Sequence, residues 1–426
     1  MPYLDHAATT PMLPQAVAAV TAAMASVGGA NASSVHRAGR RARALVEESR
    51  ETVAALLGAD PLEVVFTSGG TESINLALKG IYWARRAEGP SRVRVITSAV
   101  EHHAVLDAVH WIESHEGATV TVLPVDAEGR VDPDALDTAL HSDGGPDTVA
   151  LVSVMWANNE VGTLQPVREL AELCARHQVP FHTDAVQAVG QVSVDFGSAQ
   201  PGSARPLTAV SLSARKLGGP GGAGALLLRR GIPCVPLLHG GGHENGLRSG
   251  SLDAAGAAGL AAALSVRVAQ LEAEAARVAA LRAKLRDAVR AAVPDVEVNG
   301  PDAPDGRLPG HLHVTVPGCD GDLLLMLLDA AGVECATGSA CSSGVPEPSH
   351  VLIAMGRDPL RARSSLRFSL GHTSTEGDVE AVRAALPEAV ARARAATAAA
   401  PTSARAPHAP TPAVAPERSS PREVMS

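Results

Sequence analysis

Between residues 64 and 228 the chain alternates short β-branched, apolar runs with longer stretches of helical periodicity. This alternation is typical of an α/β sheet whose strands are joined by crossover helices. The runs predicted as strands are residues 64–67, 93–97, 119–124, 149–155, 180–183, 209–213 and 224–228. Residues 197–206 are rich in Gly, Ser, Ala and Pro, so we expect a surface loop there.

The rest of the chain predicts a second, smaller unit. Residues 254–293 are rich in Ala, Leu, Arg and Glu and have helical periodicity. The stretch is too long for an average helix, so we expect it to link two lobes. The smaller unit is predicted as α+β, with a strand at 312–316, a helix at 322–331, a strand at 365–370 and a helix ending near 399. Residues 401–426 lack the apolar content that would offset their ordering entropy, so we expect disorder and no catalytic role there.

Composition excludes several classes of protein. The chain has 426 residues, of which 46% are hydrophobic and 19% charged, so it can bury a large core. Its formal net charge is -9, and no basic stretch is interleaved with aromatic residues, so direct binding to nucleic acid is not indicated. We see neither a signal peptide nor eighteen consecutive apolar residues, which predicts a cytoplasmic protein without membrane association.

The chain contains five cysteines: Cys174, Cys234, Cys319, Cys335 and Cys341. Their odd number and the absence of a C-x-x-C pair argue against a disulfide framework or a cysteine zinc site. Cys341 lies among small residues, in Ala-Thr-Gly-Ser-Ala-Cys-Ser-Ser-Gly, where no bulky neighbour would bury the thiol. Exposure favours nucleophilic use of Cys341, whereas the other four cysteines are predicted to be structural.

Lysine is rare here, because Lys79, Lys216 and Lys284 are the only three in the sequence. Chemistry that needs a primary amine cannot pass to arginine. Lys79 and Lys284 lie in helical patterns, whereas Lys216 follows a predicted strand and enters a glycine-rich loop. A Schiff-base amine must be reachable and partly deprotonated, and both burial and the neighbouring Arg215 would lower the pKa of Lys216.

Polar residues follow several of the predicted strands, where open α/β sheets bind their ligands. The turn Ser-Gly-Gly-Thr-Glu-Ser at 68–73 precedes a helix, so it would either bind a phosphate or serve as an ordinary turn. His102 would stack on an aromatic ring, shuttle protons or remain a solvated loop residue. Asn159 follows the strand at 149–155 and suits a tight turn or substrate binding.

A carboxylate ends one further predicted strand, and a guanidinium lies within another. Asp184 ends the strand at 180–183, with Gln187 three residues on, and its carboxylate would either pair with a protonated heterocyclic nitrogen or cap a helix. Arg367 is a lone charge in a predicted strand, so we expect it to bind a substrate carboxylate or to form an internal salt bridge. His311 and His313 alternate along a strand without a nearby third ligand, so no metal site is predicted.

Together these segments, in order from Tyr3 to about Gly371, resemble the cysteine desulfurases of the class V aminotransferase group. The resemblance implies a fold-type I homodimer that uses pyridoxal 5'-phosphate, with a mostly parallel seven-stranded sheet in the large domain and a smaller α+β domain. We expect residues 1–20 to pack with the small domain, 21–253 to form the cofactor domain, 254–400 to form the linking helix and small domain, and 401–426 to be the disordered tail. The loop around Cys341 resembles that of the housekeeping branch.

The resemblance also implies a role for each site residue. Lys216 would form the Schiff base, Asp184 would pair with the pyridine nitrogen, and His102 would stack on the ring. Gln187 would reach the ring hydroxyl, while Asn159 and Arg367 would bind the substrate carboxylate. The phosphate would be held by Gly70, Thr71, Ser213 and, from the other subunit, Ser251.

The implied reaction takes sulfur from L-cysteine onto Cys341 as a persulfide, releases L-alanine and passes the sulfur to an acceptor protein. Candidate acceptors are an iron–sulfur scaffold and a tRNA-thiolating enzyme. The sequence departs from the family in having Arg215 where histidine usually precedes the lysine, which puts the rate and pH optimum in doubt. The alternatives are a selenocysteine lyase or aminotransferase of the same fold, and an inactive sulfur-relay or scaffold protein.

Overall fold

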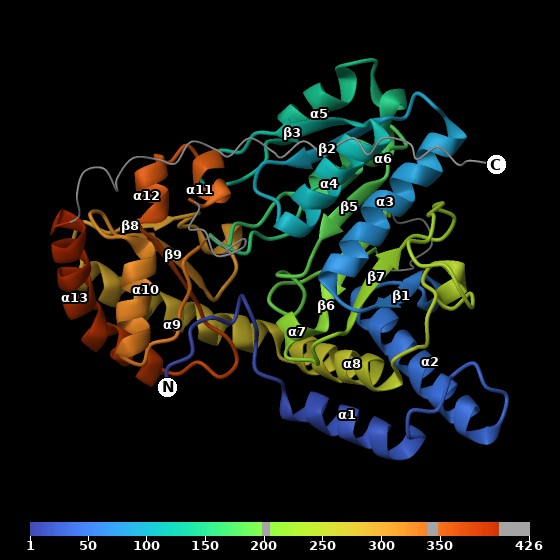
Figure 1. The fold of residues 1–426 in the computed structure, drawn as a ribbon, viewed down its shortest axis with the longest axis horizontal. Coiled ribbons are helices and arrows are strands. Elements are labelled where there is room, and N and C mark those ends of the chain that lie inside the picture. The colour runs from blue at the N-terminus through green and yellow to red at the C-terminus, as the bar shows by residue number, and fades with distance from the viewer. Residues whose placement is uncertain (198–204, 339–347, 400–426) are drawn as a thin grey trace, which may run out of the picture.

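A seven-stranded sheet forms the larger part of the molecule in the computed structural model, which describes residues 1–197, 205–338 and 348–399 (Figure 1). Its strands lie in the order β1-β7-β6-β5-β4-β2-β3. They are β1 (Val64–Thr67), β2 (Arg94–Ser98), β3 (Thr119–Leu123), β4 (Val149–Ser153), β5 (Phe181–Asp184), β6 (Ala209–Ser213) and β7 (Gly224–Leu228). Only the pairings that involve β7 are antiparallel. Each predicted strand is present within two residues of its expected ends, and the predicted α/β sheet is confirmed.

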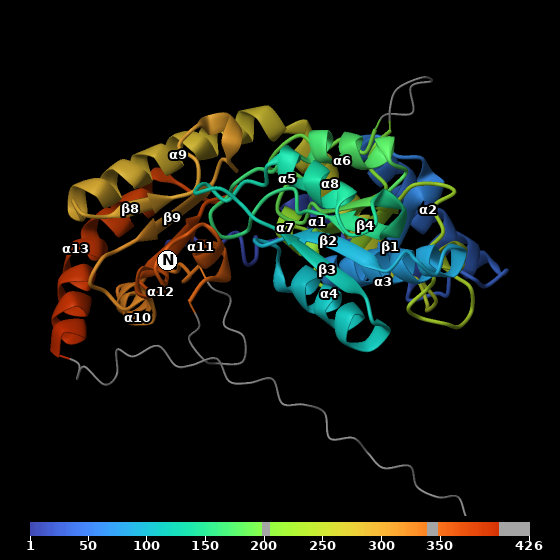
Figure 2. The ribbon, with the colours of Figure 1, turned by 90° about the horizontal axis from the view of Figure 1, so that it is seen from above.

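Helices cover both faces of this sheet (Figure 2). They are α1 (Pro14–Val27), α2 (Arg37–Leu57), α3 (Gly70–Glu88), α4 (His103–Glu116), α5 (Pro133–His141), α6 (Val167–Arg176), α7 (Ala214–Leu217) and α8 (Ala254–Ala269). Figure 2 shows α3 and α4 on one side, with α5, α6 and α8 on the other. Because the strands are buried on both faces, they are continuous apolar runs, as β4 shows with every residue buried.

A three-stranded antiparallel sheet, in the order β10-β9-β8, forms the second unit. Its strands are β8 (Glu297–Asn299), β9 (His311–Thr315) and β10 (Ser365–Ser369), and its helices are α9 (Leu271–Ala292), α10 (Gly321–Ala330), α11 (His350–Ala354), α12 (Pro359–Arg363) and α13 (Glu376–Ala399). The N-terminal residues extend this sheet through bridges from Tyr3 to Glu334 and from Asp5 to Ser369. The sequence patterns did not reveal the short, partly exposed β8.

The expected long helical stretch at 254–293 is two helices, which is a correction. α8 and α9 meet at Gln270 with a bend of 74°. α8 is largely apolar and packs on α1 and α2, whereas α9 carries charged residues and packs on α13. Each of the two helices therefore packs in the hydrophobic core of its own unit. No single helix in the described part of the chain is long and apolar enough to cross a membrane, although this bent pair reaches that length and composition.

Candidate active site

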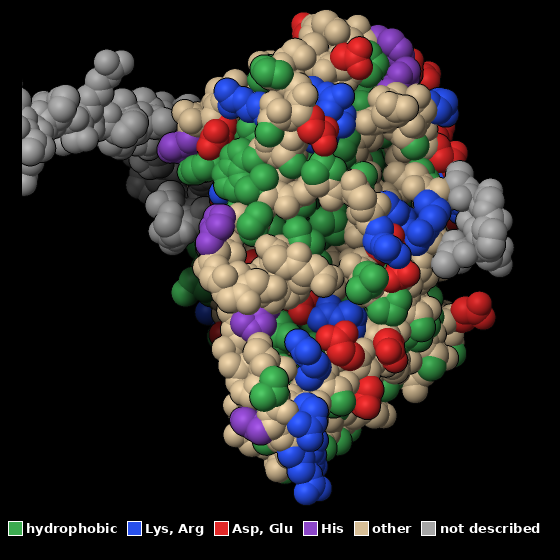
Figure 3. Space-filling model, turned by 90° about the vertical axis from the view of Figure 1, so that its right-hand side faces the viewer, with side chains coloured by type: hydrophobic (Ala, Val, Ile, Leu, Met, Phe, Trp, Pro, Cys, Tyr) green, Lys and Arg blue, Asp and Glu red, His purple; other side chains and the backbone are tan. Residues whose placement is uncertain are grey.

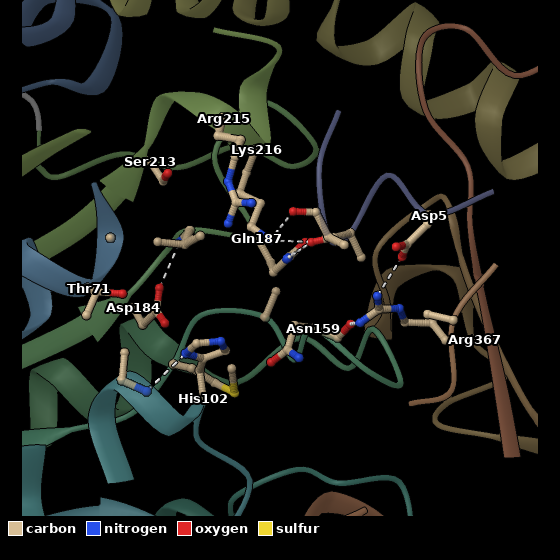
Figure 4. Close-up of a pocket in the computed structure, with 18 of the residues that line it drawn as sticks. Asp5, Thr71, His102, Asn159, Asp184, Gln187, Ser213, Arg215, Lys216 and Arg367 are labelled. Carbon is tan, nitrogen blue, oxygen red and sulfur yellow. Dashed lines mark hydrogen bonds and ion pairs between the residues drawn. The ribbon is translucent and has the colours of Figure 1, made fainter. Parts of the chain in front are cut away.

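A cavity of about 420 Å³ opens at the carboxyl ends of the large sheet's parallel strands and reaches the small unit. A pocket of this size suits a small organic ligand. The predicted site residues that line it are Gly70, Thr71, His102, Asn159, Asp184, Gln187, Ser213, Arg215, Lys216 and Arg367 (Figure 4). Cys341 lies outside the described residues. Ser251 lines a separate cavity of about 90 Å³ beside Ser68 and Arg248.

One end of the cavity is built to receive an anion. α3 begins at Gly70, directly after β1, so the unpaired N–H groups and positive end of a helix face the cavity. A side chain at Gly70 would place its Cβ 2.7 Å from Val186 Cγ2, so only glycine fits this approach. The Thr71 and Ser213 side chains also face the cavity (Figure 4).

Lys216 lies in the single helical turn α7, and not in a loop as the sequence suggested. Gly218 ends this turn with φ 84°, a conformation that glycine adopts without strain. Lys216 Nζ donates hydrogen bonds to the carbonyls of Ala7 at 2.5 Å and Ala8 at 2.8 Å. Burial and then the adjacent Arg215 lower the pKa of Lys216 to about 8, in the predicted direction. At neutral pH part of the population therefore carries a free amine.

Asp184 ends β5 with its carboxyl in the cavity. Its Oδ1 accepts a hydrogen bond from the Val186 N–H at 2.9 Å, while burial raises its pKa to about 6 and Lys216 opposes that rise. His182, in the same strand, is hydrogen bonded to Ser153 at 2.8 Å and to Ser211 at 2.9 Å. These bonds join β4, β5 and β6 and fix the strand that carries Asp184.

His102 and Gln187 approach the cavity from two different strand ends. His102 is the N-cap of α4, where its Nδ1 accepts from the Ala104 N–H at 3.1 Å. Because burial lowers the pKa of His102 to about 4, the ring is neutral and carries its proton on Nε2. Gln187 Nε2 donates to the Ala7 carbonyl at 2.8 Å, and its buried Oε1 has no partner among the residues described.

Arg367 comes from β10 of the small sheet and faces the cavity opposite Lys216 (Figure 4). It forms an ion pair with Asp5 at 2.7 Å and donates to the Asn159 carbonyl at 3.1 Å. The internal salt bridge, one of two expectations for Arg367, is therefore present. Sequence reasoning missed Asp5 as its partner, because 362 residues separate them in the chain.

Sequence reasoning also missed Glu101 as a candidate site residue. It is completely buried and precedes His102 in the chain. Its Oε1 accepts from the Ser98 hydroxyl at 2.5 Å and from the Met155 N–H at 2.8 Å. Burial raises the pKa of Glu101 to about 8, and the nearby Asp184 adds to that rise. Its position directly after a strand, next to a candidate histidine, was the available signal.

Of the remaining cysteines that the structure describes, Cys335 lines the cavity, whereas Cys174, Cys234 and Cys319 do not. Burial raises the pKa of Cys174, Cys234, Cys319 and Cys335, which suits the predicted structural role. His311 and His313 are buried in β9. In the described ranges, Asp137, His141 and His177 are the one group whose spacing would suit a metal, and they do not line the cavity.

Residues 2–382 match the family model described as aminotransferase class-V, so the chain belongs to that family. Within it, the chain belongs with the cysteine desulfurases. It is 57% identical to the IscS-like cysteine desulfurase of Mycobacterium tuberculosis, over 93% of this chain and 98% of that relative. The solved NifS-like protein has a TM-score of 0.81 at 33% identity and covers 92% of this chain and 99% of its own. SspA, solved in complex with cysteine, has a TM-score of 0.73 at 31% identity, with 87% and 99% covered.

Proposed function

We propose that this cysteine desulfurase uses pyridoxal 5'-phosphate to move the sulfur of L-cysteine onto Cys341, releasing L-alanine. One observation carries the proposal. A single cavity holds a partly deprotonated lysine, a buried carboxyl, a neutral histidine ring and a helix N-terminus. An amine-reactive cofactor with an aromatic ring and a phosphate needs each of these groups.

The unpaired atoms of the cavity support the fit of this cofactor. Thr71 and Ser213 present hydroxyls beside the start of α3, where a phosphate would take the free N–H groups. Gln187 leaves a buried oxygen without a partner among the described residues, which suits a donor on a bound molecule. Arg215 adds a guanidinium in place of the family's histidine, and its Nη1–H reaches the Thr9 hydroxyl at 3.1 Å. A guanidinium would hold a phosphate by two hydrogen bonds.

When bound, the cofactor draws electron density from the substrate α-carbon, so the α-proton is lost more easily. Lys216 would hold the cofactor covalently, and once cysteine has replaced it, its free Nζ would accept the α-proton. Asp184 would keep the ring nitrogen protonated. His102, as a neutral ring on the adjacent loop, would stack on the cofactor face.

The substrate carboxylate would bind Arg367 and Asn159. Arg367 is already paired with Asp5, and a second carboxylate fits because a guanidinium has five N–H donors. The Arg367 Nε–H is buried and has no hydrogen-bond partner in the described structure. The ion pair therefore leaves donors of the guanidinium for the substrate.

The sulfur step uses the Cys341 thiolate as nucleophile. An S–S bond forms to the substrate sulfur while the substrate C–S bond breaks and leaves its electron pair on the carbon fragment. Protonation of that fragment gives L-alanine, so cysteine and one thiol become alanine and one persulfide. The step needs no outside oxidant or reductant. The described part of the chain reaches Gly338, three residues before Cys341.

The proposal extends to a homodimer in the cytoplasm that passes sulfur to an iron–sulfur scaffold or a tRNA-thiolating enzyme. Ser251 of the partner subunit would complete the phosphate site, since this chain's own Ser251 lines a different cavity. Figure 3 supports an interface, because hydrophobic side chains gather on the face that points right in Figure 1. Exposed apolar patches mark contact surfaces in many proteins.

The deciding experiment measures alanine and persulfide after cysteine is added to the cofactor-loaded protein without reductant. One alanine and one persulfide per subunit are expected, followed by continuous sulfide release once a thiol reductant is present. The Cys341→Ala variant should keep the cofactor absorbance and lose both products, while Cys234→Ala should behave as wild type. Alanine formation that persists in Cys341→Ala would overturn the assigned nucleophile. Activity with selenocysteine alone, or amino transfer to a keto acid, would overturn the proposed reaction.

A further inference from the structure

The carboxyl of Glu160, the residue that follows the substrate-binding residue Asn159, is buried, and the proposed mechanism does not use it. Glu160 follows Asn159 in the loop after β4 and is 2% exposed. Its Oε2 accepts a hydrogen bond from the Ser349 hydroxyl at 2.5 Å, across 189 residues of sequence. This bond ties the loop of the large sheet to the start of α11.

Gly338 lies against the same carboxyl. A Cβ built on Gly338 would lie 3.2 Å from Glu160 Oε2 and 2.1 Å from Nε2 of the buried His313. Any side chain there would therefore displace the His313 ring. The backbone at Gly338 is pressed against the His313 ring, with the Glu160 carboxyl beside it, and the absence of a side chain permits this approach.

Glu160 therefore lies beside the chain before residues 339–347, at Gly338, and is hydrogen bonded to it after them, at Ser349. Gly338 is the last described residue before that range, and Ser349 is the second after it. Thr337 lines the cavity, so the contact with Gly338 lies beside the substrate site. Cys341 lies within residues 339–347, between these two positions beside Glu160.

We propose that Glu160 is a positioning residue for the sulfur step, because it is hydrogen bonded to Ser349 and lies beside Gly338, directly after the substrate-binding residue Asn159 in the chain. The inference rests on the proposed function, in which Cys341 attacks a substrate bound at Asn159 and Arg367. Loss of the bond to Ser349 would release the loop after β4 from the start of α11. The bond does not contribute to binding of cysteine itself, so sulfur transfer and substrate binding should respond differently to its loss.

The test compares Ser349→Ala with a matched cap variant, Asp358→Ala. Ser349 and Asp358 are both N-caps, of α11 and α12 respectively, but only Ser349 contacts Glu160. Each change removes a helix cap of similar worth, roughly 1 kcal/mol. Stopped-flow absorbance gives cysteine affinity from the cofactor signal, and quenched samples give the single-turnover rate of persulfide formation.

We expect Ser349→Ala to slow persulfide formation at least about tenfold, since a displacement near 1 Å can cost as much as a hundredfold in rate. Cysteine affinity and the cofactor absorbance should stay within about twofold of wild type, as for any change that spares binding. Asp358→Ala should match wild type in both measurements. Ser349→Thr and Glu160→Gln should retain most of the rate, because threonine still supplies the donor hydroxyl and glutamine still supplies an acceptor oxygen, so the hydrogen bond can form in each.

Equal persulfide rates in Ser349→Ala and Asp358→Ala would overturn the inference, as would a parallel loss of cysteine affinity and rate. Glu160→Ala offers a second route, and its folding is checked by its circular dichroism and melting temperature. If it folds with wild-type kinetics, the inference is wrong. Failure of the wild-type protein to form any persulfide would instead overturn the proposed function, and with it this inference.

Discussion

Three groups in the cavity have pKa values that differ from those they would have in water. Burial is the largest cause in each case, lowering the pKa of Lys216 to about 8, lowering that of His102 to about 4 and raising that of Asp184 to about 6. Near neutral pH the site therefore offers a partly free amine, a neutral ring and a carboxyl that is mostly ionised. A covalent cofactor with a protonated ring nitrogen requires this combination.

The first prediction concerns Arg215, the second-largest cause of the low pKa of Lys216. Only the free amine reacts with the cofactor, so its incorporation into the apo protein should speed up as pH rises through about 8. Arg215→Gln removes a positive charge, which raises the pKa of Lys216 and moves the midpoint to higher pH. A rise of about half a unit would reduce the free amine at pH 7 about threefold.

Growth of the visible cofactor absorbance between pH 6.5 and 9.5 would be followed for both proteins. Arg361→Gln provides the control, because Arg361 pairs with Glu297 on the surface of the small unit and does not line the cavity. An unchanged midpoint in Arg215→Gln would contradict the electrostatic role of Arg215.

The second prediction concerns Arg367. Arg367→Ala should raise KM for cysteine about 10- to 100-fold, because a hydrogen bond to a charged group contributes roughly 1.5–3 kcal/mol. Steady-state alanine production measures KM and kcat separately. Asp5→Asn removes the carboxylate that already pairs with Arg367, so its KM should stay at or below the wild-type value. A higher KM in Asp5→Asn would show that the ion pair is required to orient the guanidinium.

Among the elements, the start of α3 depends most on one residue type. The helix begins where β1 ends, and Gly70 lets its first turn approach Val186. Because the turn motif at 68–73 was visible in the sequence, the anion site was one of two predicted outcomes. The crowding by Val186 was not visible, since that residue follows a different strand.

The third prediction therefore exchanges glycines. Gly70→Ala should weaken cofactor retention about 5- to 150-fold, because relieving the contact with Val186 costs about 1–3 kcal/mol. Gly221→Ala is the matched control, since a Cβ there meets nothing within 4 Å. Equilibrium dialysis against the cofactor measures both. Equal retention in the two variants would show that α3 can shift without loss of the site.

On the scale of the whole molecule, long-range contacts assemble the cavity. The N-terminal segment leaves the small sheet at Asp5, and its Ala7 and Ala8 carbonyl oxygens accept hydrogen bonds from Lys216 Nζ before the chain continues into α1 beside the large sheet. A second long-range contact is the buried pair between Arg50 of α2 and Glu244, at 2.7 Å. Glu244 also accepts the Phe66 N–H of β1 at 2.7 Å.

The fourth prediction tests that buried pair. Glu244→Ala leaves the buried Arg50 guanidinium with only the half-exposed carboxylate of Glu47, which should lower the free energy of unfolding by about 3 kcal/mol, the low end of the range for a broken buried pair. The melting temperature should fall clearly in a thermal scan. Glu376→Ala removes the partner of the exposed Lys284 and should leave the melting temperature unchanged. Similar melting temperatures for the two variants would mean that Arg50 finds another partner or solvent.

The sequence by itself determined the sheet, the candidate lysine and the candidate nucleophile, because apolar periodicity and the rarity of a residue type are local properties. It placed the seven strands within two residues of their observed ends. The tertiary structure decided that ten candidate residues share one cavity, and that Arg367 pairs with Asp5 and Glu160 with Ser349. It also decided how far each pKa moves. These outcomes depend on desolvation and on packing between segments far apart in the chain, which local patterns do not encode.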